Sequence, residues 1–269
     1  MSTPSFMKQF DFGQNWADFS EHAATRARAL QACNDFAELM GGIDLIGKTL
    51  LDIGFGQGFS LLSASSLGCR VTGCDINPKC HQVIESTREF FPEARVAVTD
   101  LHVGSILDDA IVARLRTAGG GGYDIVHSWG VLHHTGNMKR ALVNAASLVR
   151  PGGHLVIAIY NRHWSSATWR IVKRLYVHSP ALAQRALVSA LYPVIWIAKL
   201  VATGHNPRRM DRGMDFYYDV VDWVGGYPYE YASIREMEQL CRPLGLMLER
   251  SIAAKVPTGC NELIFRKRG

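Results

Sequence analysis

The stretch Leu50-Leu51-Asp52-Ile53-Gly54-Phe55-Gly56-Gln57-Gly58-Phe59-Ser60 decides how this chain folds. An apolar run ends in an acid, three alternating glycines follow, and a helix-like segment begins at Phe59. Glycine lets the backbone turn sharply at the tip of a strand and approach a ligand closely, and the next helix points its N-terminus toward that ligand. The pattern predicts a nucleotide-binding loop between a strand and a helix, with a purely structural turn as the alternative.

The spacing of the glycines distinguishes this loop from the dinucleotide-binding fingerprint. The sequence reads G-x-G-x-G, whereas the fingerprint is G-x-G-x-x-G and would need its third glycine where Phe59 stands. Asp52 precedes the first glycine, where its carboxylate would repel a pyrophosphate and attract an ammonium or sulfonium group. The loop therefore favours a positively charged ligand over a dinucleotide.

Composition places the chain among ordinary globular proteins. Its 269 residues fit one large domain, or one domain with an insertion, and 48% hydrophobic residues are enough to build a core. A net charge of +5 without a basic stripe argues against a nucleic-acid partner. The six cysteines form no C-x-x-C pair, and no secretory pattern follows Met1, so we expect a cytoplasmic protein with reduced thiols.

Strand-like and helix-like segments alternate along the chain. Strands are predicted at 49–53, 70–75, 96–100, 123–128 and 154–160, with two more near 246–252 and 262–265. This order predicts an α/β fold with a doubly wound, mostly parallel, seven-stranded Rossmann-like sheet that binds ligands at the carboxyl ends of its strands. We expect a cofactor-binding core at 47–160, a helical insertion after the fifth strand at 161–232, and a last helix and two strands completing the sheet at 233–269.

Residues 1–46 are expected to form an N-terminal helical cover. Apolar residues recur at helical spacing from about residue 15 to Met40, and Gly41-Gly42 ends the pattern. Such a helix either lies over the nucleotide-binding loop or covers one face of the sheet.

Two further acidic residues lie at the carboxyl ends of predicted strands. Asp75 lies at the tip of the second strand, 21 positions beyond Gly54, where a carboxylate can hold a ribose diol through two hydrogen bonds. Asp100 ends the predicted third strand, where it would accept a hydrogen bond from an adenine amino group, or else act as a helix cap or loop carboxylate.

Five segments in this order resemble a class I S-adenosylmethionine-dependent methyltransferase. They are Leu51-Asp52-Ile53-Gly54-Phe55-Gly56-Gln57-Gly58, Gly73-Cys74-Asp75-Ile76, Thr99-Asp100-Leu101, Tyr123-Asp124-Ile125-Val126 with Val131-Leu132-His133-His134-Thr135, and Leu148-Val149-Arg150-Pro151-Gly152-Gly153. The resemblance covers residues 51–153, and it implies S-adenosylmethionine as the cofactor and S-adenosylhomocysteine as its product.

The resemblance also implies a role for each matching residue. Asp52 and the backbone of Gly54 and Gly56 would hold the methionine part of the cofactor, while Gly58 permits close approach of the backbone. The remaining contacts implied are Asp75 with the ribose hydroxyls, Ile76 with the adenine face, Asp100 and Leu101 with the adenine amino edge and face, and Ser128 near the sulfonium.

His133 and His134 follow the fourth strand, close to where the reactive methyl group should lie. A histidine can take the proton that a hydroxyl, thiol or ammonium group loses on methylation, so we expect one of the two to be the catalytic base. The alternative is that they only cap the following helix. In ubiquinone-type O-methyltransferases this segment resembles E-x-x-E-H, and its carboxylates bind a metal ion. Here Gly130 and His133 occupy the glutamate positions and only His134 matches, so no metal is expected.

The expected insertion contains an uncharged apolar stretch from Ala186 to Ala198. It is short for a membrane span between Arg185 and Lys199, it contains Pro193, and the chain must return to complete the sheet, so a span is rejected. Three alternatives remain: a substrate cap packed on the core, a homodimer contact, or a peripheral surface that contacts membrane lipid.

Arginines, acids and aromatic residues alternate over 208–230, as in a pocket for a small polar or anionic acceptor; a solvated loop is the alternative. The residues predicted to contact the acceptor are Trp129, Tyr160, Asn161, Arg212, Tyr218, Trp223 and Tyr227. The expected activity is methylation of an O, S or N atom of a small molecule. The alternatives are a lipid-linked or quinone-like acceptor at the membrane surface, a small thiol, or a module that binds the cofactor without catalysis.

Overall fold

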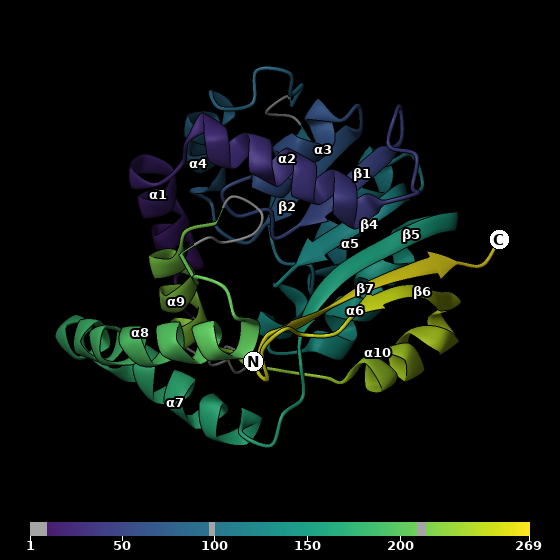
Figure 1. The fold of residues 1–269 in the computed structure, drawn as a ribbon. Helices are drawn as coiled ribbons and strands as arrows, with labels where there is room; N and C mark the ends of the chain where they lie inside the picture. The colour runs from purple at the N-terminus through teal and green to yellow at the C-terminus, as the bar shows by residue number, and fades with distance from the viewer. Residues whose placement is uncertain (1–9, 97–99, 209–213) are drawn as a thin grey trace, which may run out of the picture.

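A seven-stranded sheet forms the centre of the molecule (Figure 1). The structure, a computed structural model, describes residues 10–96, 100–208 and 214–269, and within them the strand order is β3-β2-β1-β4-β5-β7-β6. Five strands pair in parallel: β1 (Thr49–Ile53), β2 (Arg70–Asp75), β3 (Leu101–Val103), β4 (Tyr123–Trp129) and β5 (Val149–Tyr160). β7 (Cys260–Lys267) runs antiparallel between β5 and β6 (Leu246–Ile252). The predicted fold class is confirmed.

Helices cover both faces of the sheet because successive apolar residues of a strand point to opposite faces. Leu50 of β1 packs in a cluster with α2 (Arg26–Met40), α3 (Phe59–Ser66) and α4 (Cys80–Arg88). Leu51, the next residue, packs in a second cluster with α5 (Asp109–Ala118), α6 (Met138–Ser147) and α10 (Ile234–Cys241). The two clusters therefore pack these six helices against the two faces of the sheet.

Three sequence-based predictions of elements are wrong. The fifth strand, expected at 154–160, begins at Val149. The single helix expected from about residue 15 to Met40 is divided into α1 (Phe12–His22) and α2, because the Thr25 hydroxyl accepts a hydrogen bond from the Arg28 N–H at 3.3 Å and begins a new helix. The third strand begins at Leu101, whereas it was expected at 96–100. Residues 97–99 of that expected strand lie outside the described residues.

The segment expected to be an insertion contains α7 (Ser166–His178), α8 (Ala181–Thr203) and α9 (Phe216–Gly225). Figure 1 shows these helices together beside the sheet, with α1 close to α9. They share an apolar cluster that includes Tyr176, Val188 and Val220. α8 is long and apolar enough to cross a membrane, yet it packs along α9 in this cluster. Val188 is the one fully buried residue of α8, a helix that the structure describes over its whole length.

Candidate active site

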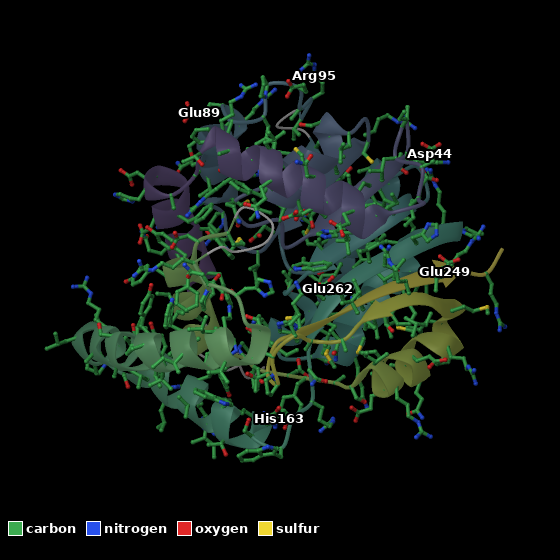
Figure 2. All side chains as sticks on the ribbon, in the orientation of Figure 1. Asp44, Glu89, Arg95, His163, Glu249 and Glu262 are labelled. Atoms are coloured by element: carbon green, nitrogen blue, oxygen red, sulfur yellow. The ribbon has the colours of Figure 1, made fainter. Side chains whose placement is uncertain are left out.

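A cleft of about 1650 Å³ lies at the carboxyl ends of the strands. One side is lined by residues that end or follow β1, β2 and β4, and the other by residues of α1, α8 and α9. Glu262 of β7 and His163 before α7, both labelled in Figure 2, also line it. Parallel strands with their carboxyl ends at one edge create this position, which is where open α/β sheets bind ligands.

The glycine loop brings its backbone into the cleft. Gly54 has a φ of +75°, and a Cβ there would lie 2.4 Å from a methyl group of Val131. Gly56 has a φ of +53° and faces the Trp16 indole of α1. Each alternative for the N-terminal helix therefore describes one part of it: α1 lies over this loop, and α2 covers one face of the sheet. Gly58 begins α3 against Ile84 and does not line the cleft.

Asp52 is buried at the floor of the cleft, with 2% of its surface exposed. The His127 ring donates a hydrogen bond from Nδ1 to Asp52 Oδ1 at 2.7 Å, which fixes the carboxylate. Its second oxygen, Oδ2, has no hydrogen-bond partner within the described part of the chain. A buried, unpartnered carboxylate oxygen beside a cleft suits a ligand that brings a positively charged donor.

Asp75 lies at the end of β2, and its carboxylate organises the loop. It accepts hydrogen bonds from the Gly56 N–H at 3.0 Å and from the Asn77 N–H at 2.8 Å. Burial raises the pKa of Asp75, and these two hydrogen bonds oppose that effect. The next residue, Ile76, is 61% exposed and lines the cleft, where an apolar side chain can contact a flat ring.

The late start of β3 moves Asp100 away from the end of its strand. Leu101 pairs with Gly73 and Val103 pairs with Asp75, so Asp100 precedes the strand. Neither Asp100 nor Leu101 lines the cleft. Gly104 and Ser105 follow β3 and do line it. The sequence reasoning missed Ser105, which occupies the position expected for Asp100.

Ser128 and Trp129 end β4 but point in different directions. Ser128 is fully buried, its hydroxyl donates to the Ile53 carbonyl at 3.0 Å, and it does not line the cleft. Trp129 lines the cleft and stacks on the His127 ring with centroids 5.7 Å apart. The side chain predicted to lie near the sulfonium therefore ties β4 to β1, and the tryptophan faces the ligand space.

His134, unlike His133, faces the cleft. Its Nδ1–H donates to the Pro228 carbonyl at 2.6 Å, which leaves Nε2 as the acceptor nitrogen. Burial lowers the pKa of His134 to about 3, so the ring is neutral near pH 7. His133 has no exposed surface, and its Nδ1 accepts a hydrogen bond from the Tyr160 N–H at 3.3 Å. Burial also lowers the pKa of His133 well below its usual value.

The residues predicted to contact the acceptor are only partly brought together. Trp129, Tyr160, Trp223 and Tyr227 line the cleft near His134, whereas Asn161 and Tyr218 do not line it. Asn161 donates to the Pro257 carbonyl at 3.1 Å, and the Tyr218 hydroxyl donates to the Asp18 carbonyl at 3.1 Å. The predicted residue Arg212 lies outside the described residues.

Three charged residues near this part of the cleft were not predicted. Lys173 of α7 has no exposed surface and lies 4.7 Å from the centre of the Trp223 ring, with two tyrosine rings about it. Burial lowers the pKa of Lys173 to about 7, although Asp222 opposes that effect. Asp222 lines the cleft together with Asp219, and burial raises the pKa of Asp222 well above its usual value. Asp219 and Asp222 are three residues apart, a spacing that places both on one face of a helix, and this was the signal in the sequence for the two acids.

The donor set of the site is suited to an organic ligand. No group of three or more His, Cys, Asp or Glu side chains within the described ranges is placed to hold a metal ion. Carboxylates, aromatic rings and glycine backbone line the part of the cleft next to β1 and β2, and apolar and aromatic side chains line much of the part next to α8 and α9.

Comparison with solved structures shows which fold the chain adopts. Magnesium protoporphyrin IX methyltransferase of Synechocystis PCC 6803, solved with bound S-adenosylhomocysteine, aligns with a TM-score of 0.53 at 14% identity, covering 96% of this chain and 89% of that chain. The likeness establishes the fold: a Rossmann-like sheet with an antiparallel seventh strand, as in class I methyltransferases.

Sequence comparison then identifies the family. The model of the methyltransferase domain matches residues 22–205, and the chain belongs to this family of S-adenosylmethionine-dependent methyltransferases. Two relatives are ubiquinone biosynthesis O-methyltransferases. That of Cupriavidus pinatubonensis is 31% identical over 142 residues, which are 51% of this chain and 53% of the relative. That of Methylobacterium sp. is 35% identical over 138 residues, 51% of each protein. The chain thus spans about half the length of these relatives.

Proposed function

We propose that the protein methylates a small organic acceptor that binds in the outer half of the cleft, with His134 as the catalytic base. The observation that carries the proposal is the neutral His134 ring, whose Nδ1–H is held by Pro228 while Nε2 remains an acceptor. A base in this state can take a proton from a hydroxyl, thiol or ammonium group.

The cofactor half of the cleft has the chemistry to hold S-adenosylmethionine, which supplies a methyl group activated by a sulfonium when it is bound. Asp52 Oδ2 would accept a hydrogen bond from the ammonium group of its methionine part. Asp75 would bind the ribose hydroxyls, and Ile76 and Ser105 would contact the adenine ring. The Trp16 and Trp129 side chains would exclude water.

In the acceptor half, the residues of this chain orient the acceptor and remove its proton. Three aromatic residues offer ring faces to the acceptor, namely Tyr160, Trp223 and Tyr227, and the two tyrosines also offer hydroxyl groups. The His134 Nε2 atom accepts the proton, and the Pro228 carbonyl stabilises the resulting imidazolium through the Nδ1 hydrogen bond. Because the pKa of His134 is low, this base suits an acceptor whose own proton is acidic.

A lipid-linked or quinone-like acceptor is a second candidate, and one observation favours it. Leu191, Val194, Ile195 and Ala198 of α8 line the cleft, so an apolar wall extends outward from the aromatic residues near His134. An apolar chain attached to the acceptor would bury itself against this wall, at about 25 cal/mol for each Å² removed from water.

The test is a transfer experiment with methyl-labelled S-adenosylmethionine and a cell extract separated into aqueous and organic-soluble fractions, with labelled products identified by mass spectrometry. His134→Ala is expected to lower turnover by about 10²–10⁴-fold, because a positioned base contributes that much. His133→Asn is the matched control and should retain turnover.

Calorimetric binding of S-adenosylhomocysteine checks that both variants are folded. Label in the organic fraction would favour the lipid-linked acceptor over a water-soluble one. A His134→Ala enzyme that binds S-adenosylhomocysteine normally and transfers methyl groups at the wild-type rate would refute the base assignment.

A further inference from the structure

The outer surfaces of α7 and α8 expose an unusual number of large apolar side chains. Ile171 and Leu175 of α7 are 61% and 63% exposed, and on α8 Leu182, Ile197 and Val201 are 80%, 55% and 80% exposed. Trp164, just before α7, is 87% exposed. We call these six residues the insertion face. Large exposed apolar side chains gathered on two helices that contact one another are typical of an interaction site.

The charges of this segment are all of one sign. All 24 acidic residues of the chain lie outside residues 161–210, whereas eight basic residues lie within them: Arg162, Arg170, Lys173, Arg174, Arg185, Lys199, Arg208 and Arg209. Of these, Arg170, Arg174 and Arg185 are exposed on α7 and α8. Three exposed arginines therefore lie on the two helices that carry the insertion face, and residues 161–210 contain no carboxylate to offset them, whereas Arg162 and Lys199 pair with Glu236 and Asp219 from outside this range.

We propose that the insertion face docks on the surface of a bilayer that contains anionic phospholipids. An apolar stripe bordered by basic residues is the arrangement that lies in the plane of such a surface, with its apolar side chains below the headgroups. Basic side chains near the surface are attracted to an anionic leaflet.

Charge also decides between a bilayer and a second copy of this chain. A two-fold dimer places the same patch on both sides of its interface. Arg174 and Arg185 would then face the same positive patch on the other copy, with no acid of the segment to pair with them. Anionic headgroups supply the opposite charge, so they complement this surface and a second copy does not.

The cleft opens beside the same helix. Val194 and Ala198 are exposed on α8 and also line the cleft, so the apolar surface continues from the insertion face to the opening. An apolar acceptor held in a bilayer would reach His134 along this surface without crossing water. This consequence rests on the proposed function, whereas the docking itself does not.

Co-sedimentation with vesicles tests the proposal. The full chain is mixed with vesicles of phosphatidylcholine alone or of phosphatidylcholine with phosphatidylglycerol. Binding is expected only to the second kind, and it should weaken as salt is added because exposed charges are screened. Ile197→Asp combined with Val201→Asp should reduce binding at least tenfold. Leu30→Asp combined with Ile46→Asp, at two exposed positions outside α7 and α8, introduces the same two charges elsewhere and should bind like the wild type.

S-adenosylhomocysteine binding, measured on each variant, separates this proposal from the proposed function, because Ile197 and Val201 do not line the cleft. Failure of the wild-type protein to bind anionic vesicles while it binds S-adenosylhomocysteine would overturn the docking proposal alone. Equal binding by the double variant would overturn it as well. A dimer seen by sedimentation velocity that dissociates in the double variant, without vesicle binding, would assign the face to a second copy.

Discussion

Asp52 shows how a single buried carboxylate can serve both the fold and a ligand. One oxygen accepts the His127 hydrogen bond, and that ring is held between Phe36 and Trp129. The second oxygen faces the cleft without a partner in the described residues. A carboxylate fixed in this way is preorganised, so little conformational entropy is lost when a cationic ligand binds.

Lys173 is the residue whose ionisation should be most visible in the stability of the protein. Burial lowers its pKa from 10.5 to about 7. Between these values the unfolded chain keeps the proton and the folded chain does not, so the free energy of unfolding should rise as pH increases from 7 toward 10.5. The gain from this residue is on the order of 4 kcal/mol, at about 1.4 kcal/mol per pH unit.

Lys173→Met should remove this dependence and stabilise the protein at pH 7, because methionine fills a similar space among the rings without a charge. Urea unfolding at pH 7 and pH 10 measures this pH dependence of the free energy of unfolding. The control is Lys139→Met, which replaces an exposed lysine on α6. Identical pH dependence in the wild type and Lys173→Met would show that the ammonium group is not buried in this way.

At the scale of elements, α1 is joined to α9 by buried polar contacts. Asn15 is 7% exposed, and its Nδ2 donates to Asp222 Oδ1 at 2.7 Å and to the Tyr218 carbonyl at 3.1 Å. These bonds hold α1 over the glycine loop, where Trp16 faces Gly56. The cover and the helices of the insertion therefore form one wall of the cleft.

Asn15→Ala should destabilise the protein by about 1–3 kcal/mol, because Asp222 and a backbone carbonyl lose a donor in a buried place. Thermal unfolding measures the loss. Gln14→Ala, which removes exposed hydrogen bonds to Asp18 and Lys79, should change stability by much less. A double-mutant cycle with Asp222→Asn is expected to show coupling between the two positions. If the effects of the two substitutions on stability are additive, the Asn15–Asp222 hydrogen bond does not contribute to the stability of the protein.

The elements near the glycine loop were predictable because local sequence determines them. β1 and β2 match their predicted bounds. β1 is an apolar run followed by glycines, and β2 is a short segment followed by Asn77-Pro78, so the end of each strand is marked by a turn signal in the local sequence. β3 was misplaced because Leu101-His102-Val103 is short and contains a polar residue. Its position is set by pairing with Gly73–Asp75, which is a tertiary contact. In the same way, only the packing of α7 against α9 brings Lys173 near Asp222, and no spacing in the sequence indicates it.

At the scale of the whole molecule, two layers of helices fix the sheet, and the helices beside its carboxyl edge complete the cleft (Figure 1). The part of the cleft next to β1 and β2 carries the residues proposed to hold the cofactor, and the part next to α8 and α9 carries those proposed to contact the acceptor. The two curated relatives align over about half of this chain and about half of their own length.

Calorimetry with S-adenosylhomocysteine measures whether the cofactor binds at the carboxyl ends of β1 and β2, as we propose for S-adenosylmethionine. The wild type should bind one molecule. Asp75→Ala should bind it at least tenfold more weakly, because charge-assisted hydrogen bonds are worth about 1.5–3 kcal/mol. Asp100→Ala should bind like the wild type, since Asp100 does not line the cleft. No heat with the wild type, or a loss in Asp100→Ala with none in Asp75→Ala, would contradict the account.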